Sequence, residues 1–202
     1  MSSFKIESGK AAPLLAANID TDVIMPKQFL KRIDRNGLDK GVFFDQRFLE
    51  SGEPNPEFIL NRPEWQGSRF LVVGPNFGCG SSREYAVWGM KQLGIRGLIG
   101  TSFAGIFDDN CQRNGILTIK LNESDLQDLG LTVSNPVSNE IEVDLPGQLI
   151  RFDGGRVIEF NIDPLSKASL IEGLDAIAST LQRQSMIDAF EQRHLEANPW
   201  LS

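Results

Sequence analysis

The sequence predicts an α/β fold with a parallel-strand core, an added antiparallel β layer and a helical C-terminal tail. Between residues 70 and 121, short apolar runs alternate with helical patterns, the order that produces parallel strands joined by right-handed crossover helices. Residues 141–160 carry closely spaced strand-like runs with glycines between them, which is typical of antiparallel pairing. From Ser166 onward, apolar residues recur at helical spacing.

Each element is bounded by turn-forming residues. A loop-rich stretch over 50–64 precedes the first clear strand. The expected strands are 70–73, 97–101 and 116–121 in the core and 141–145, 149–152 and 157–160 in the antiparallel layer. The expected helices are 83–93 and 103–113, stopped by Gly94 and by Asn114-Gly115, then a brief helix over 123–129, a helical stretch from Ser166 whose spacing continues to Leu181, and a polar helix over 184–194. We expect one domain over residues 1–202, with a helical extension from about residue 163.

Composition excludes several classes of protein. With 20 Lys and Arg against 27 Asp and Glu the net charge is −7, and no basic stripe is present to bind nucleic acid. Cys79, Cys111 and His194 are too few to build a closed zinc site or a four-cysteine iron–sulfur cluster within this chain. Two cysteines in 202 residues also argue against a disulfide scaffold and fit a reducing compartment.

The apolar runs are too short to span a membrane, which needs about 20 residues. Residues 11–17 follow Lys5 and Lys10 and faintly mimic a signal peptide, but this run has the minimum length and contains Pro13. We therefore expect a cytoplasmic protein with no membrane partner.

A glycine-rich turn over residues 76–84 (NFGCGSSRE) lies between a predicted strand and a predicted helix, where ligands bind in open parallel sheets. It is not a dinucleotide fingerprint, because Arg83 stands where the third glycine is required and no acidic residue ends the next strand. It is not a phosphate-binding P-loop either, because no Gly-Lys-Ser/Thr follows.

Two interpretations of this turn stay open from the residues alone. Ser81 and Glu84 have the spacing of a capping box, which would need no chemistry. An anion-binding turn explains more, because Arg83 in a first helical turn opposes the helix dipole unless an anion lies over the helix amides.

Three motifs together carry a family resemblance: NIDTDVIMP at 18–26, the turn itself, and SFAGIFDDNCQRNGIL at 102–117. With the stretch 54–67 they resemble the swivel domain of the aconitase superfamily, and within it the small subunits of bacterial 3-isopropylmalate dehydratase. The resemblance extends from about Phe4 to Trp200.

This resemblance implies a swivelling β/β/α domain that forms part of a split hydro-lyase. A separate large subunit would hold a [4Fe-4S] cluster, so this chain would bind no cofactor itself and would be inactive alone. Ser81 would be the base that removes the proton next to a carboxylate of a small dicarboxylate substrate, and Arg83 would bind that carboxylate. Gly80 and Ser82 are further candidate substrate contacts in the same turn. The reaction would interconvert 2- and 3-isopropylmalate by dehydration and rehydration, in leucine biosynthesis.

The segment 26–32 stands where relatives carry a substrate-sorting loop. Leu30 is a candidate contact for an apolar substrate arm, and Lys31 or Arg32 for an anionic group, although a solvated basic helix face explains these residues equally well. Asp20 and Asp22 are either turn-forming residues or part of the active-site edge.

The sequence departs from the family pattern at two positions. Tyr85 follows the Arg-Glu pair where the family usually has histidine, and Val87 stands where proline is common. Tyr85 is either a packing change or the mark of another hydroxy diacid, such as citramalate, a dimethylmalate or homoaconitate. A swivel module that binds anions without catalysis is the alternative from another class.

Overall fold

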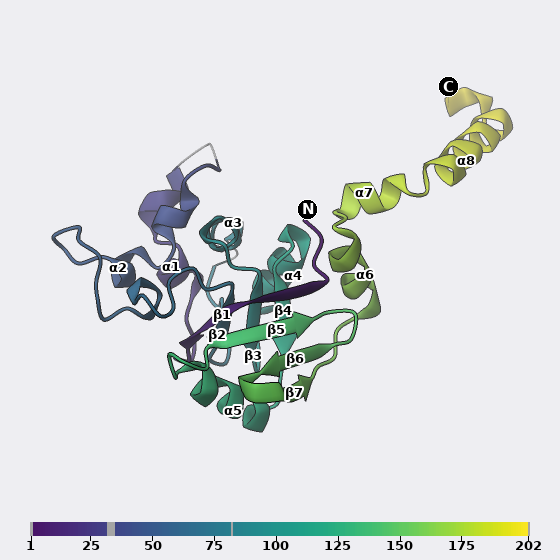
Figure 1. The fold of residues 1–202 in the computed structure, drawn as a ribbon. Coiled ribbons are helices and arrows are strands. Elements are labelled where there is room, and N and C mark those ends of the chain that lie inside the picture. Colours follow the sequence, from purple (N-terminus) through teal and green to yellow (C-terminus); the bar gives the residue numbers. More distant parts are fainter. Residues whose placement is uncertain (1, 32–34, 82, 202) are drawn as a thin grey trace.

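The computed structural model describes residues 2–31, 35–81 and 83–201. In these residues seven strands form one mixed sheet in the order β4-β3-β2-β1-β5-β6-β7 (Figure 1). The strands are β1 Ile6–Leu14, β2 Phe70–Val73, β3 Gly97–Gly100, β4 Leu117–Lys120, β5 Glu140–Asp144, β6 Leu149–Phe152 and β7 Arg156–Glu159. The helices are α1 Thr21–Ile24, α2 Phe44–Arg47, α3 Glu84–Leu93, α4 Gly105–Asn114, α5 Glu123–Val133, α6 Pro164–Glu172, α7 Ala176–Leu181 and α8 Gln184–Ala197. Short 3-10 turns are η1 Lys27–Lys31, η2 Leu38–Gly41, η3 Ile59–Asn61, η4 Asp153–Gly155 and η5 Pro199–Leu201.

Strand β1 joins the two halves of the sheet, and the sequence patterns did not predict it. Its second half pairs parallel with β2, from Ala11 opposite Phe70 to Leu14 opposite Val73. Its first half pairs antiparallel with β5. The predicted α/β class is confirmed, and the antiparallel strands prove to be a continuation of the parallel sheet. The strand escapes prediction because its alanines and Pro13 lack the β-branched alternation that marks a strand.

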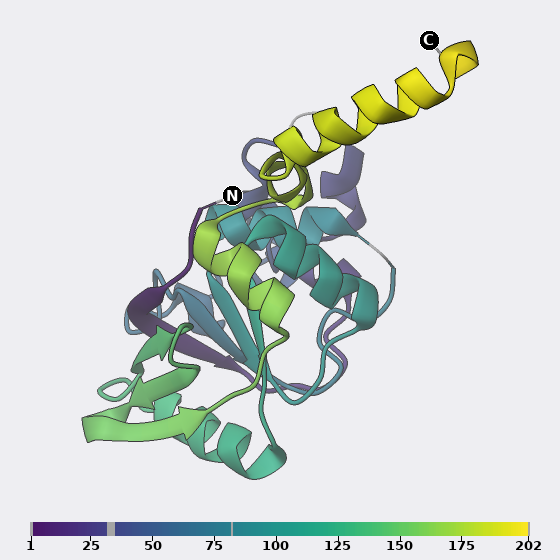
Figure 2. The same ribbon diagram turned by 90° about the vertical axis from the view of Figure 1, so that its right-hand side faces the viewer.

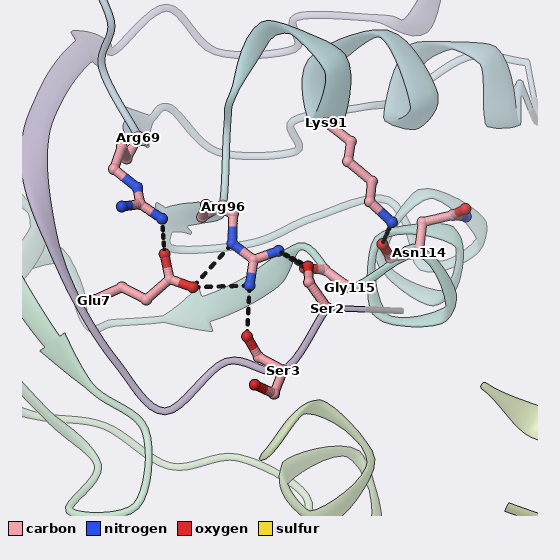
Figure 3. Close-up of polar contacts among 8 residues, drawn as sticks. All are labelled: Ser2, Ser3, Glu7, Arg69, Lys91, Arg96, Asn114 and Gly115. Atoms are coloured by element: carbon pink, nitrogen blue, oxygen red, sulfur yellow. Dashed lines mark hydrogen bonds and ion pairs between the residues drawn. The ribbon is translucent and has the colours of Figure 1, made fainter. Parts of the chain in front are cut away.

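The start of β1 is fastened to the amino ends of β2 and β3 by charge (Figure 3). The Glu7 carboxylate accepts hydrogen bonds from Arg69 and from Arg96, whose Nε and Nη2 lie 3.0 and 2.8 Å from Oε1. Arg96 also donates to Ser2 Oγ at 2.8 Å and to the carbonyl of Gly115 at 3.2 Å. Because the side chains of Glu7 and Arg96 are only 13% and 12% exposed, this pairing is little screened by water.

Side-chain alternation along the central strands builds a core on each face of the sheet. Leu71, Val73 and Leu98 face α3, α4 and the segment between β1 and β2. Phe70 and Val72 face α5 and the antiparallel strands. The views in Figures 1 and 2 agree that α3 and α4 lie together, with α5 at the opposite end of the molecule.

The predicted helix ends are confirmed more closely than the starts. Both α3 and α4 stop at glycines in the left-handed region, Gly94 with φ 101° and Gly115 with φ 80°. The starts lie one or two residues later than predicted, at Glu84 and Gly105. Helix α5 runs to Val133 rather than ending at 129. Its later turns bury apolar side chains, whereas the polar residues of its first turn had indicated only a short helix.

The tail is helical, as predicted, but is divided differently. The stretch from 166 to 181 is two helices, α6 and α7, because Gly173 ends α6 with φ 70°. Helix α6 packs on the body through buried Leu170, whose carbonyl accepts the Phe4 amide at 2.8 Å. Beyond Gly173, α7 and α8 project away from the body in both views (Figures 1 and 2).

None of the helices in the described part of the chain combines the length and the apolar character that crossing a bilayer requires.

Candidate functional site

The glycine-rich turn follows β2, at the edge of the sheet where the parallel strands end, and leads into α3. Asn76 enters the turn with φ 56°, and Gly78 and Gly80 have φ 76° and 88°. These left-handed conformations are natural for glycine and tolerated by asparagine. The spacing of glycines in the sequence therefore reports the backbone shape of this turn.

The 18–26 motif supports the turn from one side. The Gly78 amide donates to the Ile19 carbonyl at 2.8 Å, and the Thr21 amide donates to the Cys79 carbonyl at 2.9 Å. The Thr21 hydroxyl donates to the Ser81 carbonyl at 2.8 Å. Thr21 is 1% exposed, so the donor of this part-buried bond is shielded from water. The motif thus holds Ser81 from a point 60 residues earlier in the chain.

The 102–117 motif supports the turn from the other side. The Phe77 amide donates to the Ser102 carbonyl at 3.3 Å, and the Ala104 amide donates back to the Phe77 carbonyl at 3.1 Å. The ring of Phe107 lies directly over Gly78, where a Cβ would meet it at 2.2 Å. Three motifs that are far apart in the sequence therefore meet around one turn.

A small pocket opens between this turn and the start of α4. It has a volume of about 140 Å³ and is lined by Gly78, Gly80, Ser81, Arg83, Ala104, Gly105, Ile106 and Phe107. Ser81 is exposed, so its hydroxyl is accessible to a small molecule. The amino end of α4, a ten-residue helix, contributes the positive end of its dipole to the same place.

Arg83 differs from its expected setting in two respects. It was expected inside the first turn of α3, but it is the N-cap residue with an extended backbone, φ −122° and ψ 100°. Its guanidinium is paired with the Asp22 carboxylate, which also lies 3.8 Å from Lys27 Nζ. The Arg83 side chain is 17% exposed, so Asp22 neutralises and orients a mostly buried cation. The sequence indicated Asp22 only as a turn or edge residue and gave no sign of this pairing.

The capping-box interpretation is wrong. The N-cap of α3 is Arg83, not Ser81, so Ser81 stands outside the helix. The Glu84 carboxylate instead accepts a hydrogen bond from Asn114 Nδ2 at 2.8 Å, which ties the start of α3 to the end of α4. The capping pattern misled because a serine and a glutamate at this spacing are common outside capping boxes.

The structure brings together some of the predicted site residues and not others. Gly80, Ser81 and Arg83 share the pocket, whereas Leu30 and Lys31 are not among its lining residues. Leu30 is half-buried against the core beside α3, and Lys31 is exposed at the end of η1. Ser82 and Arg32 lie outside the described residues.

Tyr85, the main departure from the family pattern, is half-buried and packs against the core. Its ring lies 4.9 Å from the ring of Trp88, one helical turn along α3. Val87, the second departure, is fully buried.

The possible metal ligands of this chain lie apart from one another. Cys111 is fully buried, and burial, with a smaller contribution from Asp108, raises the pKa of its thiol well above the ordinary value. The Cys79 thiol donates to the Asn18 carbonyl at 3.4 Å. His194 is exposed on α8 and stacks on Phe190. Within the described ranges, no three His, Cys, Asp or Glu side chains gather closely enough to hold a metal ion.

Comparisons with known proteins place the chain in a family. Residues 1–124 match the model of the aconitase C-terminal domain, and residues 177–202 match that of the C-terminal domain of the 3-isopropylmalate dehydratase small subunit. The chain is 63% identical to 3-isopropylmalate dehydratase small subunit 1 of Mannheimia succiniciproducens over 100% of this chain and 99% of the relative. It is 60% identical to small subunit 2 of the same enzyme from Salmonella typhimurium, over 100% of this chain and 96% of the relative. The crystal structure of 3-isopropylmalate dehydratase (leuD) from Methanocaldococcus jannaschii superposes with a TM-score of 0.65 at 25% identity, covering 92% of this chain and 99% of that one. The resemblance carried by the three motifs is thereby confirmed, and the chain belongs to the family of 3-isopropylmalate dehydratase small subunits within the aconitase superfamily.

Proposed function

We propose that this chain is the small subunit of a two-subunit hydro-lyase that interconverts 2-isopropylmalate and 3-isopropylmalate. The observation that carries the proposal is the convergence of three motifs on the turn holding Ser81 and Arg83. The relatives that bear the name of this enzyme match the chain over its whole length, which supports the same role for the whole chain.

The side chains of the pocket suit a proton transfer next to a carboxylate. Arg83 would bind one substrate carboxylate, and Ser81 would accept the proton from the adjacent carbon. Loss of that proton and of the hydroxyl on the neighbouring carbon gives an alkene diacid and water, and water then adds back with the two positions exchanged. A serine alkoxide is far too basic to exist unaided. The guanidinium of Arg83 and the amino end of α4 would stabilise the negative charge.

Asp22 has a positioning role in this scheme. It holds Arg83 from the side of α1, which fixes the guanidinium while leaving its other donors for a substrate carboxylate. Thr21 has the same role toward Ser81, through the Ser81 carbonyl. Gly80 lines the same pocket and would contribute its backbone amide.

The reaction also needs a Lewis acid for the leaving hydroxyl, and the family resemblance assigns this chemistry to a [4Fe-4S] cluster in a separate large subunit. The donors of this chain do not suit such a cluster, because Cys111 is sealed in the core and Cys79 is bonded to a backbone carbonyl. We therefore propose a large subunit as the obligate partner, with its own cysteines as ligands.

The experiment is reconstitution of the full chain with the large subunit from the same organism. The complex is assayed on 2-isopropylmalate, citramalate, a dimethylmalate and homoaconitate. We expect turnover of isopropylmalate above the other diacids and no activity from the chain alone. Turnover of another diacid instead of isopropylmalate would overturn the isopropylmalate assignment and would identify Tyr85 as the mark of a different substrate.

Two serine variants test the role of the turn in the same complex. Ser81→Ala should lower kcat by about 10²–10⁴-fold, the usual range for loss of a catalytic base. Ser51→Ala, at an exposed serine in the loop before η3, should leave kcat unchanged. Near wild-type activity of Ser81→Ala would reduce Ser81 to a structural residue and favour a non-catalytic, anion-binding module.

A further inference from the structure

The last 26 described residues form an arm that exposes most of its large apolar side chains. We define this C-terminal arm as residues 176–201, comprising α7, α8 and η5. No residue of α8 or η5 is buried within the part of the arm that the structure describes. Six large apolar side chains of the arm are between 56% and 75% exposed: Ile177, Leu181, Met186, Phe190, Trp200 and Leu201.

The arm extends from the body after Gly173 and does not fold back onto it (Figures 1 and 2).

This exposure is unfavourable for the chain on its own. Large apolar surfaces of this kind mark interaction sites in soluble proteins. Helix α8 has 14 residues, a length at which helices isolated from tertiary contacts are only marginally stable in water. The arm therefore calls for an apolar surface that covers it.

Two observations favour the large subunit as that surface. The body matches the aconitase C-terminal domain over residues 1–124, whereas the arm matches a separate model described as the C-terminal domain of the small subunit, over residues 177–202. A swivel domain made as a separate chain loses the effective concentration that a covalent linker provides, and must replace it with binding energy. The arm is the part of this chain that supplies such an added surface.

The charge of the arm fits apolar docking. It carries Arg183 and Arg193 against Asp188, Glu191 and Glu196, a balance of 2 − 3 = −1 with the histidine neutral. Binding would therefore depend on burial of apolar side chains more than on long-range attraction.

We infer that the C-terminal arm is a docking element, which inserts the apolar side chains of α7, α8 and η5 into an apolar groove of the large subunit. This inference rests on the proposed function, because it takes the large subunit to be the partner. It adds that the arm contributes affinity for the large subunit, whereas the Ser81 turn contributes the proton transfer.

The test compares two double variants of the full chain for affinity to the large subunit, measured by sedimentation. Phe190→Ser with Trp200→Ser removes two apolar side chains from the arm. Leu131→Ser with Val137→Ser removes two from the α5 end of the molecule, where they are 68% and 88% exposed. All four side chains face solvent in the chain alone, so thermal unfolding of the body should be unchanged in both variants.

We expect the arm variant to raise Kd for the large subunit at least tenfold, and the control to change it less than twofold. When the large subunit is saturating, kcat should return to the wild-type value, because the arm does not touch the pocket. A wild-type Kd for the arm variant would overturn the inference. If the arm variant instead loses self-association of the small subunit and keeps its affinity for the large subunit, the arm binds a second copy of this chain and the inference is also overturned.

The same experiment separates this inference from the proposed function. A wild-type complex that forms but does not turn over isopropylmalate contradicts the proposed substrate, while the arm is still tested by its Kd. An active complex whose Kd is the same for the wild type and the arm variant contradicts only the docking role of the arm. If the wild-type chain fails to bind the large subunit, both are contradicted.

Discussion

Thr21→Val isolates the contribution of a single hydroxyl to the placement of Ser81. Valine has nearly the same shape as threonine, so the buried site stays filled, but the bond from Thr21 Oγ1 to the Ser81 carbonyl at 2.8 Å is lost. The Thr21 amide keeps its bond to Cys79, so the motif remains docked against the turn. The change therefore loosens one point of the turn without unfolding its support.

The expected cost differs between stability and rate. Loss of one neutral hydrogen bond lowers the free energy of unfolding by about 0.5–1.5 kcal/mol. Ser81 is exposed, so water can reach its carbonyl and the lower part of this range is expected. A misplacement of about 1 Å at a reacting group can cost about 10²-fold in rate, so we expect kcat to fall about 10- to 100-fold.

The assay measures kcat of the reconstituted complex with the large subunit saturating, together with urea unfolding of the small subunit. Ser68→Ala is the matched control, because its buried hydroxyl also donates to a backbone carbonyl, that of Trp65 at 2.6 Å, before β2 and away from the turn. It should lose similar stability and keep its kcat. If Thr21→Val also keeps its kcat while losing stability, the claim that the 18–26 motif positions Ser81 is refuted.

Three further changes test other parts of the structure. Gly78→Ala should lower the free energy of unfolding by about 2–5 kcal/mol, because its backbone is left-handed and the new Cβ would meet the Phe107 ring at 2.2 Å. The control Gly52→Ala should lose only about 1–2 kcal/mol, because Gly52 has a similar φ but open space around it. Equal losses in urea unfolding would contradict the close packing at Gly78. Asp22→Asn should raise KM severalfold by releasing the arginine of the turn, measured in the reconstituted complex; an unchanged KM would show that the pair does not orient a substrate-binding group. Burial holds the Cys111 thiol neutral in the folded chain, whereas the unfolded thiol ionises near its ordinary pKa of 9.0. Above that pH the folded state therefore binds more protons than the unfolded state. The stability advantage of wild type over Cys111→Ala should then shrink by up to about 1.4 kcal/mol per pH unit as the pH rises above 9. A constant difference in urea unfolding between pH 8 and pH 10 would contradict this.

Local patterns allowed much of the fold to be read from the sequence. Strands β2 and β6 appear where apolar runs are bounded by glycines, and α3 and α4 stop at Gly94 and Gly115. These features depend on side-chain volume and on the φ values that glycine can adopt, which are properties of a few adjacent residues. Strand β1 could not be read in this way, because its identity comes from two partners, β2 and β5, that lie far along the chain.

The candidate site divides along the same line. The glycine spacing, Ser81 and Arg83 were recognisable in the sequence because the turn is made by consecutive residues. The partner of Arg83 was not, because Asp22 lies 61 residues earlier and pairs with it only when the 18–26 motif docks under the turn. Leu30 and Lys31 were predicted to lie at the site because of their position in the sequence, but they are not among the lining residues of the pocket.

The sequence by itself determined the α/β class, the family and the turn that holds Ser81, since these follow from short-range patterns and motif order. Only the tertiary structure decided that β1 joins both halves of the sheet, that Asp22 neutralises Arg83, and that the arm leaves its apolar side chains in solvent. Each of these depends on which distant segments come into contact, and the free energy of such contacts depends on packing and charge that no local pattern records.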